Sequence, residues 1–201
     1  MKFLQIRALG ALACLLAGAA TAQPLTVAHI TYEDSHTVGG KVVHLNGAGV
    51  RYRALFQIYT AGLYLEKRAH TMADITAQPG AKRLSMTMLR EMDSADLGKL
   101  FAHGIEDNLD RTAFSRIVPG VLRMGQLFSA HQKLQAGDVF TLDWIPGTGT
   151  VVTLKGLRQG EPFKEPEFFH ALLSIWLGPQ PVDRPLKEAL LGKPPSAPTP
   201  P

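Results

Sequence analysis

The sequence predicts an α+β fold, in which an antiparallel β-sheet carries helices layered on one face. The first observation is that segments with strand periodicity come first, at 25–30, 41–45, 50–65 and 83–90. The second is that the remaining segments follow in groups: helices at 93–109 and 112–134, a hairpin at 138–155, and helices at 166–177 and 183–192. Because strands and helices are grouped rather than alternating, a doubly wound parallel sheet is not expected.

Residues 47–66 are the segment around which the fold is organised. Glycines at 47 and 49 predict a turn, and residues 50–56 then alternate between the two faces of a strand. Beyond Phe56 both faces are largely apolar: Tyr59, Ala61, Leu63 and Leu65 lie on one, and Ile58, Thr60 and Tyr64 on the other. Strands that are apolar on both faces belong inside a sheet with a packed layer on each side. This segment is therefore predicted to be the central hairpin.

The elements on either side of the central hairpin follow from shorter signals. Polar segments at 33–40 and 67–80 are expected to be turns or loops. In the strand at 83–90, Arg90 ends an apolar stripe that begins at Leu84. Asp93 or Ser94 is suited to cap the first helix, and Pro119-Gly120 is expected to kink or split the second.

The ends of the chain are expected to lie outside the domain. Residues 1–22 have the form of a signal peptide, with basic Lys2 and Arg7, an apolar run at 8–20 and small residues before position 23. Cleavage there predicts a periplasmic or secreted protein with no stable membrane span. The domain is predicted to cover 23–192, and the proline-rich residues 193–201 are predicted to be a disordered tail.

Composition excludes several classes of function. Hydrophobic residues make up 45% of the 201 and charged residues 19%, which is typical of a globular domain. Without Lys2 and Arg7, 19 basic residues face 17 acidic ones, so no nucleic-acid partner is expected. The only cysteine, Cys14, lies in the signal segment, and a lipoprotein interpretation of it is disfavoured because the usual leucine three residues earlier is missing.

Cofactor and metal sites are not expected either. The seven histidines lack the close spacing that metal ligands show: 29, 36, 44, 70, 103, 131 and 170. No Gly-x-Ser-x-Gly elbow is present, and Tyr52 stands where a dinucleotide fingerprint requires its third glycine. The sequence alone leaves the oligomeric state open.

Several motifs in order give the chain a family resemblance. They are Gly-Ala-Gly-Val-Arg at 47–51, Ile-Tyr-Thr-Ala-Gly-Leu-Tyr-Leu-Glu at 58–66, Thr-Met-Leu-Arg at 87–90, Gly-Asp-Val-Phe-Thr-Leu-Asp-Trp-Ile-Pro-Gly at 137–147 and Ile-Trp-Leu-Gly-Pro-Gln-Pro at 175–181. With these motifs the chain resembles the chalcone isomerase family, and more narrowly its secreted bacterial chalcone isomerase-like members. The resemblance implies an open-faced β-sandwich, with a ligand pocket between the sheet and the helices.

The resemblance also implies candidate ligand-binding residues. Arg51 matches the arginine that holds an ionised phenol in plant chalcone isomerases and a carboxylate in related plant fatty-acid-binding proteins. Tyr59 matches the tyrosine that assists it, and Thr60 falls near a threonine that orients substrate. Alternation alone would instead place Arg51 and Arg53 on a solvated strand face, and we keep that interpretation for Arg53. Arg90 is a further candidate, facing either a cavity or water.

Three functions remain open on these grounds. The first is a non-catalytic protein that binds a fatty acid or similar amphipathic acid. The second is an intramolecular lyase of the chalcone isomerase type, and the third is a structural or partner-binding protein of the cell envelope. The enzyme is disfavoured because the helix that begins at Asp93 lacks a tyrosine, and Leu97 falls about where the plant enzymes place one.

Overall fold

The computed structural model describes residues 24–193, and the predicted signal segment and residues 194–201 of the predicted tail lie outside the described residues. Its main sheet has seven antiparallel strands in the order β11-β10-β9-β6-β5-β4-β3. Their bounds are β3 (Ser35–Val38), β4 (Lys41–Arg53), β5 (Phe56–Leu65), β6 (Lys82–Met88), β9 (Val139–Ile145), β10 (Gly149–Leu154) and β11 (Leu157–Arg158). Two small strand pairs are β1 (Leu25–Val27) with β2 (Ile30–Tyr32), and β7 (Met92–Asp93) with β8 (Lys133–Leu134).

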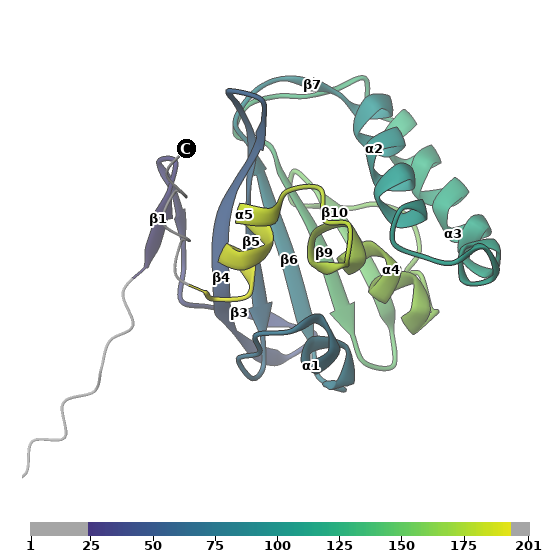
Figure 1. The fold of residues 1–201 in the computed structure, drawn as a ribbon, viewed down its shortest axis with the longest axis horizontal. Coiled ribbons are helices and arrows are strands. Elements are labelled where there is room, and N and C mark those ends of the chain that lie inside the picture. The colour runs from purple at the N-terminus through teal and green to yellow at the C-terminus, as the bar shows by residue number, and fades with distance from the viewer. Residues whose placement is uncertain (1–23, 194–201) are drawn as a thin grey trace, which may run out of the picture.

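Five helices complete the described chain: α1 (Met72–Ala77), α2 (Ser94–Glu106), α3 (Arg111–Ser129), α4 (Pro166–Leu177) and α5 (Arg184–Leu190). Figure 1 shows α4 and α5 across one face of the sheet, with α2 and α3 together at the side of α4. This arrangement confirms the predicted α+β class with helices on one face. Among residues 24–193, no helix is both long and apolar enough to cross a membrane.

The two faces of β5 are covered by different layers, as the sequence predicts for a central strand. Tyr59, Ala61 and Leu63 belong to the large core beneath the helices. Tyr64 belongs to a smaller core on the opposite face, to which Tyr32 of β2 contributes. Residues of a strand alternate between faces, so one strand supplies both cores.

The helices meet the sheet through a cluster of aromatic rings. Phe101 of α2 lies edge-on to Trp176 of α4, with ring centroids 5.3 Å apart, and to Phe128 of α3 at 5.2 Å. Phe128 in turn packs on Phe140 of β9 at 5.3 Å. Edge-to-face geometry suits the ring quadrupoles and adds about 0.5–1.5 kcal/mol per pair beyond area burial. This cluster fixes α2, α3 and α4 against the sheet.

Several local predictions were wrong. Gly47 and Gly49 are not in a turn but inside the 13-residue strand β4, and the true turn is at Ala54-Leu55. The polar segment at 33–40 contains edge strand β3, whose polar side chains reflect its position at the border of the sheet. The polar segment at 67–80 contains the short helix α1, which Thr71 caps by accepting from the N–H of Asp74.

Helix α3 also differs from its prediction. It runs unbroken from Arg111 through Pro119 to Ser129, ending five residues before the predicted end at 134. Proline removes only one hydrogen bond and its fixed φ is itself helical, so packing on either side can keep the helix intact. Ile117, Met124 and Phe128 provide that packing because all three are buried.

Candidate functional site

Arg51 and Tyr59 are directly opposite each other in the antiparallel pair of β4 and β5. Directly opposed residues project from the same face, with Cβ atoms about 4.5–5.5 Å apart. That face is the one covered by helices, since Tyr59 lies in the large core. The structure therefore brings together two of the four residues that the sequence singles out.

Tyr59 is a buried phenol held by a hydrogen bond. The indole N–H of Trp176, from α4, donates to the Tyr59 hydroxyl over 2.9 Å. Burial raises the pKa of Tyr59 to about 12, although the Trp176 bond and the nearby Arg51 charge act in the opposite direction. Tyr59 is consequently protonated at neutral pH. Because its oxygen accepts from Trp176, its own O–H is left to donate to a further group.

Arg51 is half-buried and contacts an acidic residue from the far end of the chain. Its Nη1 lies 3.4 Å from Oδ2 of Asp183, whose side chain is only 7% exposed. The same Oδ2 accepts from the backbone N–H of Tyr52 at 3.0 Å, and Oδ1 accepts from the N–H of Leu186 at 2.9 Å. Asp183 therefore caps α5 and neutralises Arg51 at the same time. The contact uses one of the five N–H donors of the guanidinium.

The approach of α5 to β4 depends on the two glycines. A Cβ added at Gly47 would overlap the carbonyl oxygen of Ala189, and one at Gly49 would lie 2.8 Å from the Ala189 Cβ. With hydrogen atoms there instead, α5 lies directly on the strand. Gly47, Gly49 and Arg51 alternate along one face of β4, so the helix that covers the glycines begins above the arginine.

A buried asparagine holds the other end of α5. Asn46 sits at the bulge of β4, where the pairing with β5 shifts between Leu45 and Gly47. Its amide nitrogen donates to the carbonyl oxygens of Leu190 and Ala69, and its oxygen accepts from the N–H of Ala69. Helix α5 is thus fixed to β4 at both ends, by Asp183 and by Asn46.

Thr60 lies on the opposite face of the sheet from Tyr59, as consecutive strand residues must. Its hydroxyl accepts from the hydroxyl of Tyr32 at 2.8 Å, beneath the β1–β2 hairpin. Burial raises the pKa of Tyr32 to about 12, with the bond to Thr60 acting against the rise. The structure therefore does not place Thr60 with Arg51.

Arg90 is exposed, and β6 ends at Met88 before reaching it. Its guanidinium carbon lies 4.7 Å from the ring centroid of Phe56, at the tip of the β4–β5 hairpin. The structure therefore places Arg90 in water rather than in a cavity, because the apolar stripe of β6 ends at Met88.

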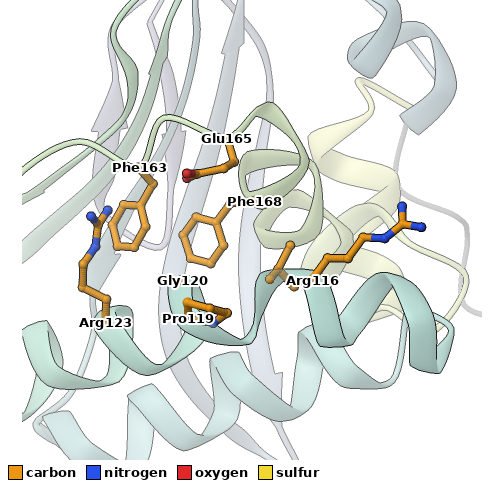
Figure 2. Close-up of a pocket in the computed structure, with 8 residues that line it drawn as sticks. Arg116, Pro119, Gly120, Arg123, Phe163, Glu165 and Phe168 are labelled. Atoms are coloured by element: carbon orange, nitrogen blue, oxygen red, sulfur yellow. The ribbon is translucent and has the colours of Figure 1, made fainter.

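A separate hollow of about 270 Å³ lies between α3 and the start of α4. Figure 2 shows Arg123 against the ring of Phe163, with Phe168 beside it. The Arg123 guanidinium carbon is 3.5 Å from the Phe163 centroid, and its Nη2 is buried without a hydrogen-bond partner in the described chain. None of the four predicted ligand-binding residues lines this hollow.

Among residues 24–193, no group of three or more histidine, cysteine, aspartate or glutamate side chains is placed to hold a metal ion.

Two important residues of the site are not predicted from the sequence. The sequence predicts helices at 166–177 and 183–192, but it gives neither Trp176 nor Asp183 as a neighbour of the tyrosine and the arginine. Asp183 is 132 residues from Arg51, and Trp176 is 117 residues from Tyr59. One signal was available for Asp183: an arginine pointing into the protein requires an acidic partner.

The fold and the site define an α+β protein in which a buried tyrosine and a half-buried arginine share the helix-covered face of an antiparallel sheet. The chain belongs to the chalcone isomerase-like family, whose sequence pattern it matches over residues 24–192. A solved fatty-acid-binding protein of Arabidopsis thaliana has a similar fold, with a TM-score of 0.65 and 16% sequence identity. The similarity covers 85% of this chain and 96% of the plant protein. No curated protein matches the chain.

Proposed function

We propose that this protein binds a fatty acid or a similar amphipathic acid without transforming it, with the carboxylate held by Arg51 and Tyr59. The observation that carries the proposal is the placement of these two residues opposite each other on the helix-covered face of β4 and β5. An arginine and a neutral phenol offer a carboxylate one charged and one neutral donor. The family and the fatty-acid-binding plant protein of the same fold support this choice of ligand.

Asp183 is the competitor that the ligand must replace at Arg51. A single N–H contact of 3.4 Å is long for a charged pair, whereas a free carboxylate can bind a guanidinium through two shorter bonds. Asp183 would keep the backbone N–H groups of Tyr52 and Leu186 after releasing Arg51. Asp183 would therefore remain hydrogen-bonded after a ligand has taken its place at Arg51.

The acyl chain would lie between β5 and α4, among the apolar side chains of the large core. Trp176 would have to shift to admit it, because its ring lies between Tyr59 and Phe101. Binding should therefore change the fluorescence of Trp176. A Trp144→Phe background isolates this signal, because the protein contains two tryptophans.

The test is to titrate the protein in that background with palmitate and to analyse by mass spectrometry the lipids that co-purify with it. We expect saturable binding that Arg51→Ala weakens by about tenfold or more, as for the loss of one charged hydrogen-bond partner. Arg53→Ala is the matched control, since Arg53 is an exposed arginine two residues along the same strand. Equal palmitate affinity in the two variants would contradict the proposed anchor.

We also propose that the chain is exported after cleavage of residues 1–22, because a basic start, an apolar run and small residues precede position 23. Amino-terminal sequencing of protein recovered from outside the cytoplasm should begin at Gln23. Recovery of an intact Met1, or of lipid attached to Cys14, would contradict the proposal.

A further inference from the structure

The tip of the β4–β5 hairpin exposes three large apolar side chains: Leu55 in the turn, Phe56 on the face of its partner Arg53, and Tyr52 on the other face beside Gln57. Leu55 is 93% exposed, Phe56 59% and Tyr52 42%. Isolated exposed apolar residues are ordinary on protein surfaces, as with Leu122 on α3, which is 64% exposed. Three such side chains at the tip of one hairpin are different, because exposed apolar surface that is concentrated in one place marks interaction sites.

The turn itself has an unusual sequence for its geometry. Arg53 pairs with Phe56, so Ala54 and Leu55 form a two-residue loop, and Ala54 has a φ of 52°. Two-residue hairpin loops with positive φ normally use Asn-Gly, Asp-Gly or Gly, which adopt this conformation more readily. Here the chain has a strained alanine and a fully exposed leucine instead. Folding does not explain this choice, because a polar turn would serve the hairpin better.

Positive charge surrounds the apolar turn. Arg53 is exposed beside it, and Arg90 stacks on Phe56. Within the described part of the chain, neither arginine is in an ion pair. The nearby acids are engaged elsewhere, since Asp183 pairs with Arg51, and Glu91, next to Arg90, pairs with Lys133. The hairpin tip therefore combines apolar side chains with two available cations.

We propose that this tip docks the protein on the surface of an anionic phospholipid bilayer. Leu55 and Phe56 enter the boundary between head groups and acyl chains, and Tyr52 lies at the level of the head groups, where amphipathic rings gather. Arg53 and Arg90 bind lipid phosphates, adding the attraction of basic residues to a negative surface.

The shape of the tip favours a bilayer over a protein partner. Stable protein interfaces bury about 800 Å² on each side, more than a two-residue turn and its neighbours present. A fluid bilayer deforms around a narrow convex tip and needs no matching groove. This docking does not depend on fatty-acid binding, since the apolar turn exists whether or not Arg51 holds a ligand.

The test places an environment-sensitive nitrobenzoxadiazole label on the tip. The full chain carries Cys14→Ser and Leu55→Cys, so the label attaches only at position 55, and a matched protein carries Leu122→Cys instead. Each is mixed with vesicles of phosphatidylglycerol and phosphatidylcholine in equal parts, or of phosphatidylcholine alone. Because the label reports only its own surroundings, membrane binding through another part of the chain does not imitate insertion of the tip.

We expect the label at position 55 to brighten severalfold with the anionic vesicles and to be quenched by spin-labelled lipid, while the label at position 122 does neither. Arg53→Gln should lower partitioning onto these vesicles about fivefold, as expected for one basic residue near a negative surface. Palmitate binding in solution should be unchanged by Leu55→Cys, which separates this proposal from the proposed function. Equal signals at positions 55 and 122 would overturn the proposal. So would brightening without vesicles that rises with protein concentration, since it would identify a second copy of the chain as the occupant.

Discussion

Asp183 lies with one carboxylate oxygen 3.4 Å from Nη1 of Arg51 while its other oxygen caps helix α5. A single side chain therefore connects the candidate anion anchor to the position of the last described helix. The two oxygens have separable roles, because the cap needs only an acceptor whereas the contact with Arg51 also depends on charge. A substitution that keeps the acceptor and removes the charge distinguishes them.

Asp183→Asn is predicted to increase the affinity for palmitate by about tenfold, since it removes the charge that competes for Arg51. Asparagine keeps the oxygen that caps α5 at Leu186 but cannot also accept from the N–H of Tyr52, so the free energy of unfolding should fall by about 0.5–1.5 kcal/mol. Asp110→Asn is the matched control, because Asp110 caps α3 through the same type of bond away from Arg51. The measurement is the palmitate titration of Trp176 fluorescence. Weaker binding by Asp183→Asn would mean that Asp183 is part of the ligand site.

Gly47→Ala is predicted to destabilise the protein by about 1–3 kcal/mol, the usual range for overpacking. The added methyl group meets the backbone of Ala189, which cannot rotate away as a flexible side chain would, so α5 must move off β4. Chemical denaturation followed by circular dichroism measures the change. Gly125→Ala is the control: nothing lies within 4 Å of its added Cβ, and removing a glycine from α3 should stabilise by up to about 1 kcal/mol. Similar losses in both variants would show that the close contact of α5 with Gly47 is unimportant.

The raised pKa of Tyr59 predicts that the protein loses stability at alkaline pH. Burial raises its pKa from 10.0 to about 12 in the folded protein. The folded state thus keeps the proton where the unfolded state loses it. The contribution to stability is complete below pH 10 and disappears as the pH rises to about 12, and for a shift of this size it is about 3 kcal/mol. Tyr32 acts in the same direction, with its pKa also raised to about 12.

The measurement is the free energy of unfolding between pH 9 and 12, a window set by these two pKa values. The free energy of unfolding of Tyr59→Phe should decline less steeply with rising pH than that of the unsubstituted protein. The variant should also be less stable at neutral pH by about 1–3 kcal/mol, because the buried N–H of Trp176 loses its acceptor. If the free energy of unfolding declined equally steeply with pH in both proteins, Tyr59 would be accessible to water.

The sequence predicts the faces of the central hairpin because alternation has a period of two, which fixes Tyr59 and Thr60 on opposite sides once the strand is recognised. It does not predict the role of Gly47 and Gly49, since glycine is as typical of turns as of close helix packing. Only the contact with Ala189, about 140 residues later in the chain, shows that these glycines allow close helix packing rather than a turn. The same applies to the site: Arg51 and Tyr59 are near in sequence, whereas Asp183 and Trp176 reach them through tertiary structure.

The last prediction concerns catalysis: this protein should not convert chalcones to flavanones at a useful rate. The resemblance implies that plant chalcone isomerases place a tyrosine on the helix after the sheet, with a lysine close by. Here Leu97 occupies about that position of α2 and is 2% exposed, so an alkyl side chain in the large core stands where the phenol would be. Lys99 points to water and pairs with Asp96 on the surface. Loss of one donor aimed at developing charge costs about 10²–10³-fold in rate.

Arg51 and Tyr59 alone do not compensate for that loss. Groups that hold the ionised substrate and the transition state equally tightly improve binding without accelerating the reaction. The measurement is the loss of chalcone absorbance with the same preparation that binds palmitate, which shows that the protein is folded. We expect no turnover above the uncatalysed reaction. Turnover near the ~10 s⁻¹ typical of enzymes, abolished by Arg51→Ala but not by Arg53→Ala, would instead identify the protein as an isomerase.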